Sequence, residues 1–355
     1  MKLLVTGACG FVGSQIIEGI LNRTASGVEV WGLDNLCRRG SETNLARLQQ
    51  LGVRFRHGDV RVTSDLQSFP EVDWVIDCSA QPSVLAGVDG NASSRQLVEC
   101  NLNSTIELLE LCRRNRSGFI LLSTSRVYSI NQLAQLPLKT TGLRFELDDA
   151  QSFPQGVSVR GLARDFSTQP PVSLYGATKL ASEQLAIEYG LAYDFPVGVN
   201  RCGVLSGAGQ FGRPDQGIVS YWIHSWQARS SLRYIGFSGS GRQVRDCLHV
   251  ADLAELVWKQ LSSLKAGATE VHHVSGGIDR SFSLAEMSAW CQDRFGKHTV
   301  LPDPTARPFD VPWLVLDSHA TQQAWDWTPH WSIDEIFEDI AKFAEQHPEW
   351  LSRTV

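Results

Sequence analysis

A glycine-rich turn near the amino terminus constrains the fold of this 355-residue chain more than any other feature. Gly7, Gly10 and Gly13 are spaced GxxGxxG, after an apolar run at Lys2–Val5 and before a segment with helical periodicity. The first glycine permits a tight turn, the second lets the backbone approach a pyrophosphate, and the third lets helix and strand pack closely. Glycine triplets also occur in purely structural loops. In this strand–turn–helix context, the spacing predicts a dinucleotide-binding site.

The rest of the sequence alternates short apolar runs with segments of helical periodicity. Most of the runs are apolar on both faces, as strands inside a parallel sheet must be. This alternation predicts an α/β fold, a Rossmann-type doubly wound parallel sheet with helices on both faces. The expected strands are Lys2–Val5, Val28–Leu33, Val53–His57, Trp74–Cys78, Phe119–Ser123, Val197–Arg201 and Val271–Val274.

Two stretches interrupt the alternation, Ser129–Ser173 and Ser206–Arg245. The first is long and rich in Gly, Pro and Gln, which is more typical of a functional flap than of a connector. We expect this flap to overhang the bound substrate. Beyond the last strand, helical patterns at Ser283–Phe295 and Ser332–His347 flank a Pro-rich passage.

These interruptions predict two structural parts. The larger is a cofactor-binding Rossmann domain of residues 1–203 with 246–275, in which 129–173 is the inserted flap. The smaller is a C-terminal substrate-binding lobe of residues 204–245 with 276–355. We expect the lobe to lie over the carboxyl edge of the sheet, where ligands of open α/β sheets bind.

Bulk composition narrows the class of protein. A formal charge of −6 and a pI near 5.9 argue against a nucleic-acid-binding surface. No apolar stretch is long enough to cross a bilayer, and the first residues do not resemble a signal peptide. The eight cysteines form no CxxC pair, and His and Cys spacing predicts no metal site. We therefore expect a cytoplasmic globular protein with reduced thiols.

An acidic residue lies where a dinucleotide-binding fold needs one. Asp34 ends the second expected strand, about twenty residues beyond the glycine loop, where a carboxylate accepts hydrogen bonds from the adenosine ribose. Because this carboxylate repels a 2′-phosphate, the sequence favours NAD over NADP. Arg38 and Arg39 follow closely. We expect them to be solvated or near the pyrophosphate rather than bound to a 2′-phosphate.

A tyrosine and a lysine at helical spacing predict oxidation of a carbinol. Tyr175 and Lys179 are four residues apart, on what should be one helix face. Oxidation needs a base for the hydroxyl proton, and a phenol becomes useful near neutral pH when an ammonium close by stabilises the phenolate. Of the six tyrosines, only Tyr175 has a lysine at this offset.

The sequence leaves the roles of the other polar residues near the expected strand ends open. Ser123, Thr124 and Ser125 could each hydrogen-bond the reacting oxygen. Asp59 would receive the adenine amino group or cap a turn. Asn101 opens an apolar helix as a cap, or as an amide behind the catalytic tyrosine.

The order of these motifs resembles that of the extended short-chain dehydrogenases/reductases, the NAD-dependent epimerase/dehydratase family. The resemblance covers essentially the whole chain. In that family the catalytic hydroxyl lies four residues before the tyrosine of a Val-Tyr pair. Here the pair is Val127–Tyr128, so the resemblance selects Thr124 and assigns Ser123 to the cofactor.

Longer stretches resemble the family's 2-epimerases of CDP-linked sugars, including DNLCRRGSETNLARL, QFGRPDQGIVSYW and GSGRQVRDCLHVADL. This implies that NAD stays bound while the sugar is oxidised to a keto-sugar and reduced again from the opposite face. It also implies that Arg245 binds the diphosphate, with Arg307 and Asp310 as a second clamp. From sequence alone, a salt bridge of Arg245 with Asp246 or Asp252 is equally open.

The chain also departs from the family pattern. Val204 and Ser206 replace an asparagine and a tyrosine of the usual sugar-pocket wall, and Ser129 replaces a glycine. Dehydratases of the family carry an Asp–Glu pair directly after the catalytic threonine. Ser125 and Arg126 stand there instead, which disfavours dehydration. A UDP-sugar 4-epimerase, a dehydrogenase or a decarboxylase of the family stays open, and a non-catalytic NAD-sensing protein is the more remote alternative.

The predicted site comprises a catalytic, a cofactor-binding and a substrate-binding set. The catalytic residues are Thr124, Tyr175 and Lys179. The NAD-binding residues are Gly7, Gly10, Phe11, Val12, Asp34, Asn35, Asp59, Val60, Ser79, Ala80, Asn101, Ser123, Tyr175, Lys179 and Cys202. The residues for a nucleotide-diphosphate sugar are Gln81, Ser125, Arg126, Gln216, Arg245, Arg307 and Asp310. By resemblance, the helix containing Tyr175 pairs with a second copy in a homodimer or homotetramer.

Overall fold

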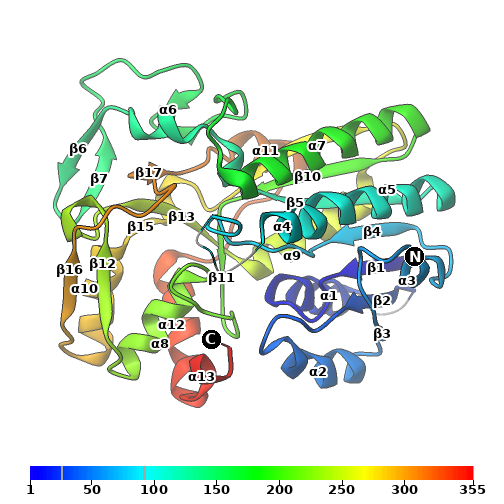
Figure 1. The fold of residues 1–355 in the computed structure, drawn as a ribbon, viewed down its shortest axis with the longest axis horizontal. Coiled ribbons are helices and arrows are strands. Elements are labelled where there is room, and N and C mark those ends of the chain that lie inside the picture. Colours follow the sequence, from blue (N-terminus) through cyan, green and yellow to red (C-terminus); the bar gives the residue numbers. More distant parts are fainter. Residues whose placement is uncertain (25–26, 89, 91–92, 355) are drawn as a thin grey trace.

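The computed structural model describes residues 1–24, 27–88, 90 and 93–354 and centres on a seven-stranded parallel sheet (Figure 1). The strand order is β14–β10–β5–β4–β1–β2–β3, which confirms the doubly wound Rossmann arrangement. The order reverses between β1 and β4, so the glycine turn after β1 lies at the switch point where such sheets bind ligands. The strands are β1 Lys2–Thr6, β2 Glu29–Asp34, β3 Arg54–His57, β4 Trp74–Asp77, β5 Gly118–Thr124, β10 Val197–Cys202 and β14 Thr269–Val274.

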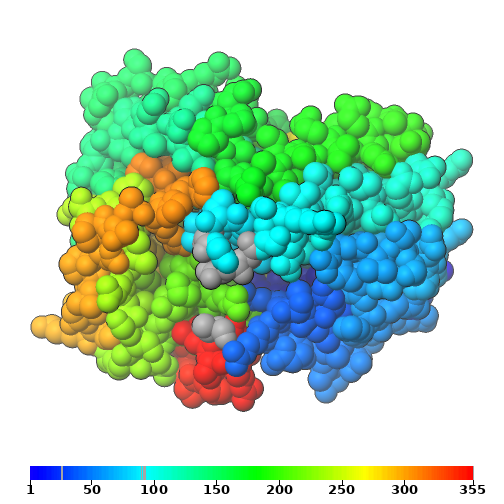
Figure 2. Space-filling model, viewed as in Figure 1, coloured from blue at the N-terminus to red at the C-terminus, as the bar shows by residue number. Residues whose placement is uncertain are grey.

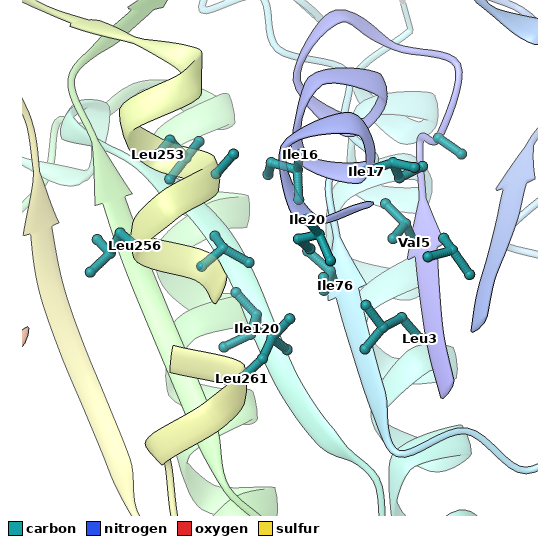
Figure 3. Close-up of a cluster of buried hydrophobic side chains, with 14 of the residues drawn as sticks. Leu3, Val5, Ile16, Ile17, Ile20, Ile76, Ile120, Leu253, Leu256 and Leu261 are labelled. Carbon is teal, nitrogen blue, oxygen red and sulfur yellow. The ribbon is translucent and has the colours of Figure 1, made fainter. Parts of the chain in front are cut away.

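Alternating side chains of the strands pack under helices on opposite faces of the sheet. On one face, Leu3 and Val5 of β1 pack with Ile16 of α1 and Leu253 of α9 (Figure 3). On the other face, Leu4 belongs to a cluster that includes residues of α5 and α7. The sheet domain contains α1 Phe11–Arg23, α2 Leu45–Gln50, α3 Thr63–Gln67, α4 Ser94–Val98, α5 Ser104–Asn115, α7 Ser173–Tyr193, α9 Val250–Ser263 and α11 His319–Trp325.

The C-terminal lobe has a core of its own. Trp222 and Trp226 of one helix pack with Met287 and Phe337 of two others. Figure 2 shows this lobe, in yellow-green, orange and red, set against the blue and cyan start of the chain. Its elements are β11 Val204–Ser206, α8 Ile218–Gln227, β12 Leu232–Ile235, β13 Val244–His249, β15 Ser281–Ser283, α10 Leu284–Phe295, β16 Val300–Asp303, β17 Trp313–Leu314, α12 Ile333–Gln346 and α13 Trp350–Thr354.

Both C-terminal helices predicted from sequence begin at a serine cap. The hydroxyl of Ser283 accepts a hydrogen bond from the backbone N–H of Glu286, and the Glu286 carboxylate accepts one from the Ser283 backbone N–H. Ser332 and Glu335 form the same capping box at α12. These reciprocal bonds satisfy amides that the helix itself leaves unpaired, and so fix where each helix starts.

The segment 129–173 is folded rather than open. It contains α6 Ile130–Ala134 and two short hairpins, β6 Leu138–Thr141 with β7 Arg144–Leu147, and β8 Val157–Ser158 with β9 Gly161–Leu162. Leu133 and Phe166 from this segment share a buried cluster with Trp313 of β17. The segment therefore packs against the C-terminal lobe.

Within the described residues, no helix is long and apolar enough to cross a membrane. No cluster of three or more His, Cys, Asp or Glu side chains in this part of the chain is arranged to hold a metal ion. All eight cysteines are unpaired.

Candidate active site

A cavity of about 690 Å³ separates the carboxyl edge of the sheet from the C-terminal lobe. Its sheet side comprises the glycine loop and the residues that follow β2, β3 and β4. Its lobe side comprises residues 210, 211 and 213–218 and the arginines at 245 and 307. Of the described residues that line it, none belongs to 129–173, so the flap is not part of the cavity lining, and its position over a bound substrate stays a prediction.

The glycine loop has the tight geometry that its spacing predicts. Gly7 has φ +59°, a left-handed conformation that favours glycine. A Cβ on Gly13 would lie 2.2 Å from the carbonyl oxygen of Gly7, so helix α1 contacts the turn without room for a side chain. Gly10 is the N-cap of α1, and the loop and first turn line the cavity. The helix amino terminus is therefore available to an anion.

Asp34 is held in place by two backbone amides. Its Oδ2 accepts a hydrogen bond from the Cys9 N–H at 2.9 Å, and its Oδ1 accepts one from the Leu36 N–H at 2.8 Å. Burial raises the pKa of this carboxyl group, while the amide bonds oppose the shift. The carboxylate lines the cavity at the end of β2, the position expected to bind the adenosine ribose.

Asp59 also lines the cavity, but it has several partners. It accepts two hydrogen bonds from the Arg61 guanidinium, at 2.9 and 2.7 Å, and one from the side chain of Asn35. Its Oδ1 also accepts a bond from the Arg61 backbone N–H at 2.9 Å. These contacts hold the pKa of Asp59 well below its usual range. The geometry therefore supports the turn interpretation of this residue.

The three predicted catalytic side chains come from two neighbouring elements. Tyr175 and Lys179 lie on the buried side of α7, and Thr124 ends β5. Burial raises the pKa of Tyr175 to about 12, and a hydrogen bond with Thr124 opposes that rise. Arg126 is the cation that lowers the pKa of Tyr175, whereas the sequence argument expected Lys179 to do so.

Lys179 is itself enclosed. Burial lowers the pKa of Lys179, while the carboxylates of Asp77 and Glu183 raise it. Its ammonium group thus lies in a region with two buried anions nearby. Asp77 accepts hydrogen bonds from Thr6 and Ser79, which fixes its orientation at the end of β4.

Asn101 does not cap a helix, and its role as an amide behind the tyrosine stays a prediction. It lies in a π-helical turn, Glu99–Asn103, and not at a helix cap. Its Oδ1 accepts a bond from the Gln81 N–H at 2.8 Å, and its Nδ2 donates to the Gln81 carbonyl and to Thr178 on α7. The amide therefore ties a cavity-lining loop to the helix that carries Tyr175.

A buried chain of polar groups behind the site was not predicted from the sequence. The Ser123 hydroxyl bonds to Glu183 of α7, and Glu183 pairs with Arg201 of β10 at 2.7 Å. Arg201 donates to the Tyr128 hydroxyl at 3.0 Å, and that hydroxyl also bonds to His273 of β14. A charged residue inside the apolar run VGVNRC was the one signal that could have indicated such a pair.

Three arginines converge on the lobe side of the cavity. Arg245 bonds to Asp310 at 2.7 Å, and not to Asp246 or Asp252, so the two predicted clamp residues are partners. Burial, together with the nearby charges of Arg245 and Arg307, lowers the pKa of Arg126 to about 10. This concentration of guanidinium groups, with one carboxylate among them, favours an anionic ligand such as a diphosphate.

Most of the predicted ligand-binding residues line this one cavity. From the cofactor set these are Gly7, Gly10, Phe11, Val12, Asp34, Asn35, Asp59, Val60, Ser79 and Ala80, and from the substrate set Gln81, Arg126, Gln216, Arg245, Arg307 and Asp310. The remaining predicted residues lie outside the described lining, namely Asn101, Ser123, Thr124, Ser125, Tyr175, Lys179 and Cys202.

Apolar side chains pack around Tyr175, the predicted catalytic tyrosine. Ala86, Leu97 and the partly buried Val84 pack against Tyr175, which is 7 % exposed. Val84 itself lines the cavity. These side chains thus form an apolar cover on Tyr175, and Val84 extends it to the cavity lining.

Comparison with known proteins agrees with this geometry. The model of the NAD dependent epimerase/dehydratase family matches residues 3–274. This chain belongs to that family. NAD is therefore its cofactor, and the glycine loop, the free amino terminus of α1 and the oriented Asp34 carboxylate fit that molecule.

Individual members of the family are more distant. The chain is 29% identical to CDP-paratose 2-epimerase of Salmonella typhi over 338 residues, covering 93% of this chain and 95% of the relative. It is 26% identical to UDP-glucose 4-epimerase of Caenorhabditis elegans, covering 99% and 100%. The solved UDP-glucose 4-epimerase of Thermus thermophilus in complex with NAD superposes with a TM-score of 0.77 at 26% identity, covering 97% of this chain and 99% of that one. A UDP-glucuronic acid 4-epimerase of Bacillus cereus reaches a TM-score of 0.79 at 23% identity, covering 98% and 99%.

Proposed function

We propose that this family member is an epimerase of a nucleotide-diphosphate sugar that oxidises a ring carbon and then reduces it from the opposite face. The observation that carries the proposal is the position of Thr124 at the end of β5 and of Tyr175 and Lys179 on the buried side of α7, in the same protein as an NAD site and an arginine-rich pocket wall. A hydroxyl pair of this kind serves proton transfer at a carbinol, and the arginines serve a diphosphate.

Each residue then has a distinct task. The glycine loop and Asp34 would hold NAD, which when bound would supply the hydride chemistry of both half-reactions. Tyr175 removes the proton from the sugar hydroxyl and gives it back, and Thr124 hydrogen-bonds the same oxygen as charge develops there. Arg126 stabilises the negative charge of the phenolate, and Lys179 binds the ribose of the nicotinamide. Arg245 and Arg307 hold the diphosphate, so that the sugar stays bound while it presents its second face.

Two relatives suggest different substrates. The likeness to CDP-paratose 2-epimerase over nearly the whole chain supports a CDP-linked sugar. UDP-glucose 4-epimerase is the second candidate, favoured by relatives of comparable coverage and by solved structures. Dehydration is the less favoured reaction because Ser125 and Arg126 replace the Asp–Glu pair of family dehydratases. A dehydrogenase or decarboxylase would use the same three catalytic residues.

The test is to incubate the purified protein with CDP-, UDP- and GDP-linked sugars and to follow the sugar protons by NMR. We expect one epimer pair to reach equilibrium without net accumulation of NADH. The Tyr175→Phe variant should be slower by about 10²- to 10⁴-fold, the usual contribution of general acid–base catalysis. The proposal fails if the native protein produces no epimer from any of these sugars, or if the variant matches it.

We also propose a homodimer or homotetramer formed through α5 and α7. Leu174 and Leu191 on α7 are 40% and 58% exposed, and Tyr193 is 48% exposed. Exposed apolar residues on a long helix favour pairing with a second copy. Light scattering on the native protein and on a Leu191→Glu variant would test this.

A cytoplasmic location remains a prediction from the sequence.

A further inference from the structure

A loop of the C-terminal lobe lies directly against the glycine loop. Phe211 packs with Phe11, which is in the first turn of α1, and with Val250 and Trp350. Residues 210, 211 and 213–218 of this lobe loop line the same cavity as the start of α1. The lobe therefore reaches the part of the Rossmann domain where a dinucleotide's pyrophosphate binds.

Two side-chain bridges hold this lobe loop across the cavity. Arg38, four residues after Asp34, donates to Gln216 Oε1 and to the Phe211 carbonyl, both at 3.2 Å. Ser83 donates to Asp215 Oδ2 at 2.8 Å from the loop that follows β4. The two bridges come from different segments of the sheet domain. The lobe loop is thus attached on both sides of the space above the glycine loop.

The same wall contains two cations and several unpartnered polar atoms. Burial, together with the charge of Arg213, lowers the pKa of Arg38 to about 10, so the two guanidinium groups lie close enough to repel. Among the described residues, Arg213 Nε, Ser41 Oγ and Gln210 Oε1 are buried without a hydrogen-bond partner. Ser41 is 1% exposed and Gln210 is 8% exposed, and all three residues line the cavity. Unpartnered buried polar groups are costly, which favours a polar ligand at this place.

We propose that Arg213 of the lobe, together with Arg38, clamps the NAD pyrophosphate against the amino terminus of α1. The phosphates then lie between backbone amides on one side and two guanidinium groups on the other. NAD is held by both parts of the protein, and it leaves only when the lobe loop lifts. This inference rests on the cofactor and not on the sugar reaction proposed above. The two proposals therefore fail separately.

The cleaner variant is Arg213→Ala, because the hydrogen bonds between the lobe loop and Arg38 do not involve its side chain. Arg233→Ala is the matched control, since Arg233 is an exposed lobe arginine on β12 outside the described cavity lining. We would measure NAD content per chain after gel filtration, and dissociation constants for NAD, adenosine, CDP and UDP by calorimetry. Melting temperature would report folding.

The native protein and the control should retain NAD. Arg213→Ala should weaken NAD binding by about 10- to 100-fold, the loss expected for hydrogen bonds to a charged group. Adenosine, CDP and UDP should bind as before. An unchanged NAD affinity would overturn the proposal. An equal loss for adenosine would indicate a damaged fold, and a loss confined to CDP and UDP would place the arginine at the sugar nucleotide; both results also overturn it. If Arg213→Ala does not fold, Arg213→Gln provides the same comparison.

Discussion

The two walls of the cavity bind anions by different means. The sheet wall uses backbone, with the amino terminus of α1 and a carboxylate positioned by two amides. The lobe wall uses long side chains, chiefly Arg245 paired with Asp310. Backbone donors depend on a short run of glycines and bind every ligand that carries a phosphate. Guanidinium groups depend on residues far apart in the chain, so Arg245 and Asp310 can change with the substrate while the glycine loop stays the same.

The largest expected effect comes from substitutions in the glycine loop of the sheet wall. Gly13→Val should abolish NAD retention and lower the melting temperature, because even a Cβ at this position would meet the Gly7 carbonyl at 2.2 Å. Gly10→Ala is the matched control, since its added Cβ would lie 3.1 Å from the same oxygen. We expect that variant to fold and to bind NAD more weakly. Gel filtration followed by nucleotide extraction would measure both. If the Gly13→Val protein kept its NAD, the glycine loop would accommodate a side chain at this position, and the prediction would be wrong.

The next effect separates the two walls. Arg245→Ala should raise the KM for the nucleotide sugar by about 10- to 100-fold, since a charge-assisted bond is lost, and leave NAD binding unchanged. Steady-state kinetics and the NAD content of the variant provide the two readings. Arg233→Ala, which changes an exposed lobe arginine outside the described cavity lining, is the control. If the NAD content of the Arg245→Ala protein fell together with its affinity for the nucleotide sugar, Arg245 would contribute to the binding of both ligands.

The smallest effect concerns the stability of the two parts. Burial lowers the pKa of His224 in the lobe and of His272 in the sheet domain to about 4, and that of His273 to about 3. In the unfolded chain these histidines take up protons near pH 6.5, so the stabilisation is complete above that pH and is lost as pH falls toward 4. Each contributes at most about 1.4 kcal/mol per pH unit in this window.

His224→Gln should therefore reduce the loss of stability between pH 6.5 and 5, and all other groups cancel in the comparison with the native protein. Denaturant unfolding at a series of pH values measures the difference. One shared transition with a shallower pH slope would mean that lobe and sheet unfold together. A change confined to one of two transitions would show that the lobe unfolds separately. An unchanged slope would contradict the argument.

Local patterns predicted the sheet domain well. All seven strands lie within two residues of their expected bounds. The patterns that predict a buried strand or a glycine turn involve only residues next to one another in the sequence. The sequence also indicated Asp34, and the tyrosine and lysine of α7, from spacing alone.

Contacts between distant residues could not be predicted in this way. Arg245 had two acidic neighbours in sequence, yet its partner is Asp310, on a segment that reaches β13 only after folding. The apolar cover on Tyr175 and the link from Arg38 to the lobe loop likewise join residues far apart along the chain. Lys179 was expected to lower the pKa of Tyr175, but Thr124 and Arg126 are the groups that do so.

The buried chain from Ser123 to His273 has a consequence for how this protein can evolve. It joins β5, α7, β10 and β14 through groups that are almost fully enclosed. Losing Glu183 alone would leave the Arg201 charge buried without a counter-ion, and losing Arg201 alone would do the same to the carboxylate. Either single substitution should strongly destabilise the folded protein, whereas replacing both residues with apolar groups should destabilise it less. We therefore expect these two positions to vary together among close relatives. Paired substitutions at these positions would then indicate common descent, even between relatives that differ in sugar specificity.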